Sequence, residues 1–357
     1  GFILSSQVLV PSVDENVLWD CVLNEKGVPR LSIARTHFHE LKQRDIPLLV
    51  EAFQYWKNYD EYMVLEGTNN FNPDKEKKYC AVKCSKRGND VFASRLDKKL
   101  GFLNYEKYQN LRFFDVSDFK VDKKVFTSML WVTLSYHSRR CSLWDAWLNC
   151  MSEFNLFITN LRNKYGKIQV MRFPDTSPGS KGLAFGYPHF HMVLLFEEAK
   201  FEVFPRMEEN EEGELELVFR IQEKDEFHNQ GKWHSFTDVK ALSGIGATLN
   251  YCRKHSQNRA FGDSEKAVLN CALTWLFRKK SFTLSKGFRE ALRVHVSLRN
   301  SKGVFQETLL GDRISEWSWK FIGVFSGFEL GVMDSFVWSS VLTREFVEKL
   351  VDGRGRY

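Results

Sequence analysis

The spacing of apolar positions predicts a series of strands and helices in the middle of the chain. Residues 129–134 are apolar, aromatic and β-branched, which is typical of a buried strand. From Ser142, a helix N-cap residue, to Gly166, apolar side chains recur three and four positions apart, and this period predicts one long amphipathic helix. Residues 168–173 and 187–196 are two further predicted strands. We expect them to pair antiparallel because they follow each other closely along the chain.

The same pattern predicts further helices and divides the chain into three regions. The predicted helices comprise residues 237–256, 267–279 and 342–351. The predicted regions are a mixed N-terminal region (1–124), a central region of strands and helices (125–260) and a mostly helical C-terminal region (261–357). A chain of 357 residues is long enough for about two domains with buried cores.

The charge of the chain is small in total but unevenly distributed. Lys and Arg exceed Asp and Glu by 51 to 45, which leaves a net charge of +6. Residues 75–99 alone carry nine Lys or Arg against three acids, whereas residues 208–216 contain six Glu. We expect a basic hairpin in the first segment, which contacts phosphates through Lys83, Lys86 and Arg87, and a solvated insertion in the second. The alternative for the basic segment is a charged sheet edge that prevents aggregation.

Composition excludes some classes of protein. No run of apolar residues is long enough for a membrane span. The first residues lack an initiator Met and a basic segment, so we expect neither a signal peptide nor the natural start of the protein. Seven cysteines without a repeated spacing favour a reduced, cytoplasmic protein. Cys80 and Cys84 lack a second cysteine pair, so we do not expect them to bind zinc.

Two histidines in the predicted strand 187–196 are the sharpest local signal. His189 and His191 flank Phe190, and residues two apart in a strand point to the same face, so both imidazoles can reach one metal ion. The alternative is a pair of histidines that only make hydrogen bonds in a half-buried strand. The same tripeptide at His37 and His39 precedes a polar run that predicts a helix start, where such a pair diverges; we interpret it as structural.

The strand before the histidines offers a third metal ligand. Asp175 follows residues 168–173, and antiparallel pairing would bring its carboxylate beside His189 and His191. Imidazole and carboxylate ligands suit Mg²⁺ or Mn²⁺, and Zn²⁺ remains open.

A helical segment further along the chain carries a candidate nucleophile. Tyr251, Lys254 and His255 share one helix face by their spacing. A tyrosine hydroxyl is a weak nucleophile at its ordinary pKa of about 10 and needs a metal ion or a cation nearby, a role that Lys254 can take. A tyrosine followed three positions later by a lysine is common on helices. It indicates a catalytic residue only because it lies downstream of the strand with the two histidines. The basic residues expected to contact DNA are, besides those named above, Arg253, Arg278, Lys279 and Lys280.

These motifs, taken in order, resemble a known family. The chain resembles the HUH endonuclease superfamily and, within it, the rolling-circle replication initiator (Rep) proteins of plasmids and viruses. The resemblance rests on three segments in the same order: residues 130–135, residues 186–191, and Tyr251 with Lys254. The likeness covers roughly residues 125–260. Residues 84–90 and 278–285 further resemble Rep proteins of archaeal plasmids.

The resemblance implies an α+β fold with a central antiparallel sheet flanked by helices, with the histidines on a middle strand and the tyrosine on a helix that faces it. It also implies that His189, His191 and a third ligand hold Mg²⁺ or Mn²⁺ while Tyr251 nicks single-stranded DNA and forms a 5′-phosphotyrosine. The family's third ligand often lies close before the histidines, whereas Asp175 precedes them by 14 positions. Members with two tyrosines carry the second about four positions on, where this chain has His255, so we expect a single-tyrosine mechanism.

We therefore expect a metal-dependent DNA nicking and joining enzyme that starts rolling-circle replication. Its expected partners are single-stranded DNA at a replication origin and the host replication machinery, with no membrane involved. The alternatives are a relaxase or single-strand transposase of the same superfamily, and a non-catalytic DNA-binding replication protein.

Overall fold

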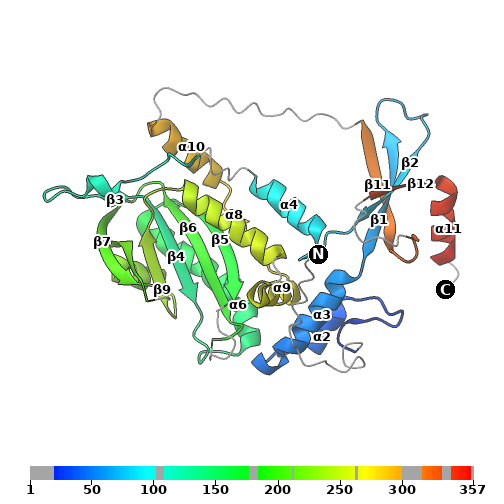
Figure 1. The fold of residues 1–357 in the computed structure, drawn as a ribbon, viewed down its shortest axis with the longest axis horizontal. Helices are drawn as coiled ribbons and strands as arrows, with labels where there is room; N and C mark the ends of the chain where they lie inside the picture. Colours follow the sequence, from blue (N-terminus) through cyan, green and yellow to red (C-terminus); the bar gives the residue numbers. More distant parts are fainter. Residues whose placement is uncertain are drawn as a thin grey trace, which may run out of the picture.

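The protein is described from a computed structural model, which is α+β and contains three antiparallel sheets (Figure 1). The structure describes residues 20–101, 108–176, 184–210, 213–261, 264–299, 316–331 and 339–354. For residues 254–261, 296–299, 339 and 354 the description is limited to the backbone. Within these ranges, no helix combines the length and the apolar character that a membrane span requires.

The central sheet has five antiparallel strands, and the histidine strand is its middle one. The order across the sheet is β10 (Thr283–Leu284), β5 (Ile168–Thr176), β6 (Pro188–Phe196), β4 (Met129–Ser135) and β9 (Thr237–Ala241). The predictions of strands at 129–134, 168–173 and 187–196, and of antiparallel pairing between the last two, are confirmed. Because β6 has a partner on each side, its backbone is held in register along its whole length.

Helices cover both faces of this sheet (Figure 1). On one face lies α6 (Leu143–Tyr165), and on the other lie α8 (Gly246–Phe261), α10 (Phe288–Arg299) and α4 (Asp90–Leu100). The alternation of β6 sorts its side chains between the two cores: Phe190 and Met192 join α6, whereas Val193 and Leu195 join the opposite core.

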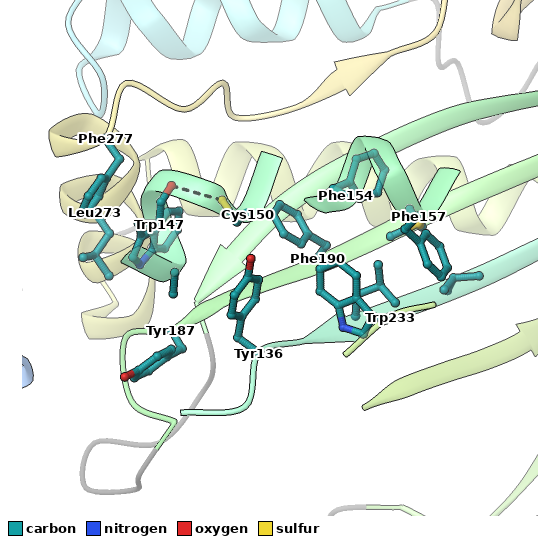
Figure 2. Close-up of a cluster of buried hydrophobic side chains, with 14 of the residues drawn as sticks. Tyr136, Trp147, Cys150, Phe154, Phe157, Tyr187, Phe190, Trp233, Leu273 and Phe277 are labelled. Atoms are coloured by element: carbon teal, nitrogen blue, oxygen red, sulfur yellow. Dashed lines mark hydrogen bonds between the residues drawn. The ribbon is translucent and has the colours of Figure 1, made fainter. Parts of the chain in front are cut away.

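The face under α6 is filled with large aromatic side chains (Figure 2). Ser142 caps the helix by accepting a hydrogen bond from the Asp145 backbone N–H, and Gly166 ends it with a positive φ of 77°, as predicted. Trp147 is fully buried and donates its indole N–H to the carbonyl of Gly186 at 2.8 Å. This contact ties the helix to the chain just before β6, and thereby to the histidine strand.

The described residues of the segment with six glutamates lie at the ends of two paired strands and next to them. The second sheet consists of β3 (Phe126–Thr127), β7 (Phe201–Glu209) and β8 (Leu215–Ile221), and α7 (Lys224–Gly231) follows it. Arg220 of β8 forms ion pairs with Glu208 and with Asp238 of β9, which links this hairpin to the central sheet.

The third sheet joins the two ends of the chain. Its order is β11 (Trp317–Ser326), β1 (Glu61–Asn69), β2 (Lys78–Lys83) and β12 (Ser339–Leu342), and α11 (Arg344–Arg354) packs on one face. Strands of the C-terminal region therefore pair with strands of the N-terminal region, which the expectation of a mostly helical C-terminal region did not include. The reason is that β1 and β2 need partners more than 200 residues away, and no local pattern encodes such pairing.

A small helical layer connects the third sheet to the rest. It consists of α2 (Leu31–His37), the short 3₁₀ helix η1 (Gln43–Asp45), α3 (Ile46–Asn58) and α9 (Glu265–Leu276), with a second 3₁₀ turn, η2 (Val116–Asp118), elsewhere. Two aromatic rings of α3 lie against Trp275 of α9: the ring centroid of Trp56 is 5.3 Å from that of Trp275, and the centroid of Phe53 is 5.5 Å from it.

Three local predictions were wrong. The predicted helix 237–256 is a strand, β9, followed by a helix that begins at Gly246, because residues 237–241 pair with β4. The predicted basic hairpin has only its first strand, since Asn89 caps helix α4 where a second strand was expected. The pair at His37 and His39 lies at the end of helix α2 and beyond it, not at a helix start.

Candidate active site

The two histidines of β6 lie together on the face of the central sheet that carries α8. His189 and His191 are both half-buried, and their ring centroids are 4.7 Å apart. Phe190 between them is fully buried in the opposite core, where its ring lies 5.7 Å from that of Phe154 (Figure 2). The prediction that one strand presents both imidazoles to the same side is therefore confirmed.

Asp175 lies beside this pair, as the antiparallel pairing predicted. It is the direct cross-strand partner of His189, and its Oδ2 is 3.7 Å from Nε2 of His191. Its side chain is completely buried, and its Oδ1 accepts a hydrogen bond from the Thr176 backbone N–H at 2.6 Å. A buried carboxylate is costly unless it has polar or charged partners, so its place next to two imidazoles indicates a polar site rather than part of the apolar core.

Two side chains of β4 orient His191, and the sequence argument did not include either of them. Thr133 is the cross-strand partner of His191, and its Oγ1 lies 3.1 Å from Nδ1 of the imidazole. The ring of Trp131 is stacked on that of His191, with a centroid distance of 5.5 Å and an interplanar angle of 28°. Partners at Nδ1 and at the ring face fix the imidazole so that Nε2 points towards Asp175. The sequence contained one signal for these two residues: side chains alternate between the two faces of a strand, so positions 131 and 133 of β4 share a face.

Tyr251 reaches the same site from helix α8. Its ring lies 5.7 Å from that of Trp131 in an edge-to-face arrangement, so one indole contacts both the candidate nucleophile and a candidate metal ligand. The buried neighbours Leu249 and Cys252 anchor this helix in the core beneath it. Tyr251 itself is 50% exposed, so part of its side chain reaches solvent. Lys254 and His255 belong to the same helix, but their side chains lie outside the described residues.

The electrostatics of the site keep His191 neutral. Burial lowers its pKa to about 4, and the nearby positive charge of Lys266 adds to the effect. Lys266 lies in the first turn of α9, 75 positions from His191, and no local signal could have associated the two residues. Burial also raises the pKa of Tyr251, so the phenol is protonated at neutral pH.

The donor chemistry suits Mg²⁺ or Mn²⁺, but the ligand set is incomplete among the described side chains. A neutral imidazole and a buried carboxylate are ligands that such ions accept. However, no group of three His, Cys, Asp or Glu side chains within the described ranges converges closely enough to hold an ion. His189, His191 and Asp175 are thus adjacent, and a bound ion would require small side-chain movements or a further ligand.

Three of the expected DNA-contacting residues have structural partners instead. Lys83 and Lys86 are almost completely buried: Lys83 pairs with Asp60 and Asp90, and Lys86 with Glu61. Arg87 donates to the Ser281 hydroxyl and to the Lys279 carbonyl. Lys83 and Lys86 are buried in ion pairs and cannot approach a phosphate, and the guanidinium of the half-buried Arg87 is engaged in these hydrogen bonds. We therefore do not include the three residues in the proposed DNA surface.

The remaining basic candidates differ in exposure. Arg253 of α8 forms an ion pair with Asp97 of α4 at 2.6 Å. Arg278 and Lys280, which follow α9, are exposed, and Lys279 between them is half-buried. Arg278 and Lys280 are therefore the accessible members of the predicted set.

Comparisons with models of protein families, with curated proteins and with solved structures find no match for this chain.

Proposed function

We propose that the protein is a metal-dependent endonuclease and strand transferase that nicks and rejoins single-stranded DNA through Tyr251, and that it initiates rolling-circle replication of a plasmid or virus. The observation that carries the proposal is that the histidine pair of β6 and Tyr251, which lies 60 positions after His191 in the sequence, share one face of the sheet, where the rings of His191 and Tyr251 both contact Trp131. The order of motifs that resembles Rep proteins supports the same conclusion.

The residues would divide the reaction as follows. His189, His191 and Asp175 would hold Mg²⁺ or Mn²⁺, which supplies positive charge to the scissile phosphate. Thr133 and Trp131 keep the imidazole of His191 in one orientation, so that little reorganisation is needed when the ion binds. Lys266, whose positive charge acts on His191, would favour the accumulation of negative charge on the phosphate oxygens.

Tyr251 would be the nucleophile. Its hydroxyl oxygen forms a bond to phosphorus while the bond between phosphorus and the 3′ oxygen breaks. The phenolic proton passes to a base or to water, and the 3′ oxygen takes up a proton from solvent as it leaves, so that it departs as a hydroxyl. The product is a 5′-phosphotyrosine and a free 3′-OH that can prime synthesis, and attack by a 3′-OH reverses the reaction. Because burial raises the pKa of Tyr251, loss of the proton would require positive charge from a bound metal ion.

The test is a search for DNA attached to Tyr251. The protein is incubated with Mn²⁺ and single-stranded oligonucleotides that tile the DNA flanking its own gene, and peptides are analysed by mass spectrometry. We expect an adduct on the peptide that contains Tyr251 and a loss of at least about a thousandfold in nicking rate for Tyr251→Phe. Tyr55→Phe is the matched control, since Tyr55 is also partly exposed on a helix. Metal-dependent nicking that persists in Tyr251→Phe would refute the proposal.

A further inference from the structure

The third sheet has one covered face and one open face. Tyr62 and Val64 of β1 point towards α11 and form a small core with Phe325 of β11 and Val347 of the helix. Figure 1 shows α11 against this side of the sheet. The alternate positions point the other way, and none of the following side chains on that face is buried: Met63, Leu65, Cys80, Val82, Trp317, Trp319, Phe321, Val324 and Val341.

Strand β11 places three aromatic rings in a row on this open face. Trp317, Trp319 and Phe321 alternate along the strand, and the centroids of the two indoles are 6.4 Å apart. Trp319 is 46% exposed and Phe321 is 56% exposed. A surface strand rarely exposes consecutive large aromatic residues on one face unless they contact a partner.

Gly67 makes the orientation of Trp319 possible. The two residues are cross-strand partners, and three ring atoms of Trp319 lie 2.8 to 3.0 Å from the point where a Cβ of residue 67 would be. Nearly equal distances to three ring atoms mean that the indole lies flat across β1, with one face on the glycine. The other face of the ring is therefore turned to solvent and can stack on a planar group.

Lysines stand at one end of this aromatic row. Nζ of Lys78 lies 4.2 Å from the centroid of the Trp317 ring, and Nζ of Lys75 lies 5.3 Å from it. Lys75 is also 3.5 Å from Glu316, so Lys78 contributes most of the positive charge on this face. Open aromatic rings beside ammonium groups match the alternation of bases and phosphates in a single nucleic-acid strand.

We propose that this face binds single-stranded DNA, with bases stacked on Trp319 and Phe321 and phosphates contacted by Lys78 and Lys75. The choice of DNA over RNA rests on the proposed function, whereas the stacking chemistry does not. A duplex hides the faces of its bases, so flat rings on a sheet cannot stack on them. A second copy docked face to face would bring Lys78 of both chains into one apolar interface, which disfavours self-association through this face.

The test measures binding separately from cleavage. Fluorescence anisotropy of a labelled oligothymidylate of about 20 nucleotides is recorded with the full chain in EDTA, where nicking does not occur. We expect Trp319→Ala and Phe321→Ala each to weaken binding by at least about fivefold, because stacking on each ring is lost. Phe328→Ala is the matched control, since Phe328 is 94% exposed in the turn after β11, and it should bind like the wild type. None of the three replaced side chains is buried, and thermal unfolding curves show that each variant is folded under the conditions of the binding assay.

The proposal would be overturned if Trp319→Ala and Phe321→Ala bound oligothymidylate with unchanged affinity, or if the two substitutions weakened the binding of duplex DNA just as much. It would also be overturned if the wild type self-associated and Trp319→Ala became monomeric while its binding of oligothymidylate stayed intact. The binding assay runs without divalent metal and its variants lie outside the histidine site, whereas the nicking assay depends on Mn²⁺ and on Tyr251. The binding assay and the nicking assay can therefore fail independently.

Discussion

Oδ2 of Asp175 lies 3.7 Å from Nε2 of His191, although the two residues are 16 positions apart and on different strands. Thr133 lies 3.1 Å from the other nitrogen of the same imidazole. His191 is thus held between a carboxylate and a hydroxyl, with the indole of Trp131 on its ring face. This arrangement is typical of a histidine that is oriented for a ligand rather than one that only fills space.

The first prediction concerns Asp175. Asp175→Asn keeps the shape of the side chain and removes its charge, so we expect Mn²⁺-dependent nicking to fall about 10- to 100-fold, with a matching rise in the Kd for Mn²⁺. Nicking rates at a series of Mn²⁺ concentrations and calorimetric titration with Mn²⁺ measure both effects. Asp74→Asn, at an exposed position, is the control and should behave like the wild type. Unchanged Mn²⁺ affinity in Asp175→Asn would exclude Asp175 as a ligand.

The second prediction concerns the partner on β4. Thr133→Val is nearly isosteric and removes the hydroxyl 3.1 Å from Nδ1 of His191. We expect about a tenfold loss of Mn²⁺ affinity, together with a changed NMR signal of the His191 ring, because the imidazole is no longer fixed at Nδ1. Thr159→Val on α6 provides the control, since that hydroxyl only donates to the Asn155 carbonyl. If the NMR signal of His191 is the same in both variants, Thr133 does not orient the ring.

The third prediction concerns pH. Burial and Lys266 lower the pKa of His191 to about 4, whereas an unfolded histidine titrates near 6.5. Between these values the unfolded chain binds a proton that the folded chain does not, so the free energy of unfolding falls as the pH falls. This contribution amounts to about 2 kcal/mol between pH ~7 and pH ~5. Below pH ~4 both states are protonated, and the loss from this group is complete.

Urea unfolding in EDTA at about pH 7 and pH 5 measures this effect as the difference between wild type and His191→Gln. The variant should lose less stability on acidification than the wild type. Equal losses in the two proteins would show that His191 titrates near its ordinary pKa.

The fourth prediction concerns Gly67. A Cβ at this position would lie 2.8 Å from the nearest Trp319 ring atom, so Gly67→Ala must displace the indole from its flat position. We expect about a threefold or larger loss of oligothymidylate affinity, because a tilted ring offers less surface for stacking. Gly353→Ala is a matched control on α11, where a Cβ would meet no atom within 4 Å. Wild-type affinity in Gly67→Ala would mean that the orientation of Trp319 is unimportant for binding.

The fifth prediction separates buried from exposed basic residues. Lys86→Met removes the buried ammonium from Glu61 and leaves that carboxylate with only the half-exposed Arg30, so we expect the free energy of unfolding to fall by about 2 kcal/mol or more. The salt dependence of DNA binding by the folded variant should not change. Lys280→Met should show the reverse: unaltered stability, and a slope of log affinity against log salt that is lower by about 0.7. A lower slope of log affinity against log salt for Lys86→Met would show that Lys86 does contact DNA.

The sequence by itself determined the elements whose faces are encoded by local period. The alternation of 187–196 placed His189 and His191 on one side of a strand, and Ser142 and Gly166 marked the ends of α6. Antiparallel pairing of two strands close in sequence was enough to bring Asp175 to the histidines. These inferences succeeded because side-chain direction and helix capping depend on neighbours within a few residues.

Only the tertiary structure decided which distant segments meet. It placed Trp131 and Thr133 beside His191, brought the charge of Lys266 to the site, and paired β11 with β1 across more than 200 residues. It also buried Lys83 and Lys86, whose charges in the sequence resembled a phosphate-binding surface. Burial and long-range strand pairing depend on the competition among all segments for the same core, so they cannot be obtained from any one segment alone.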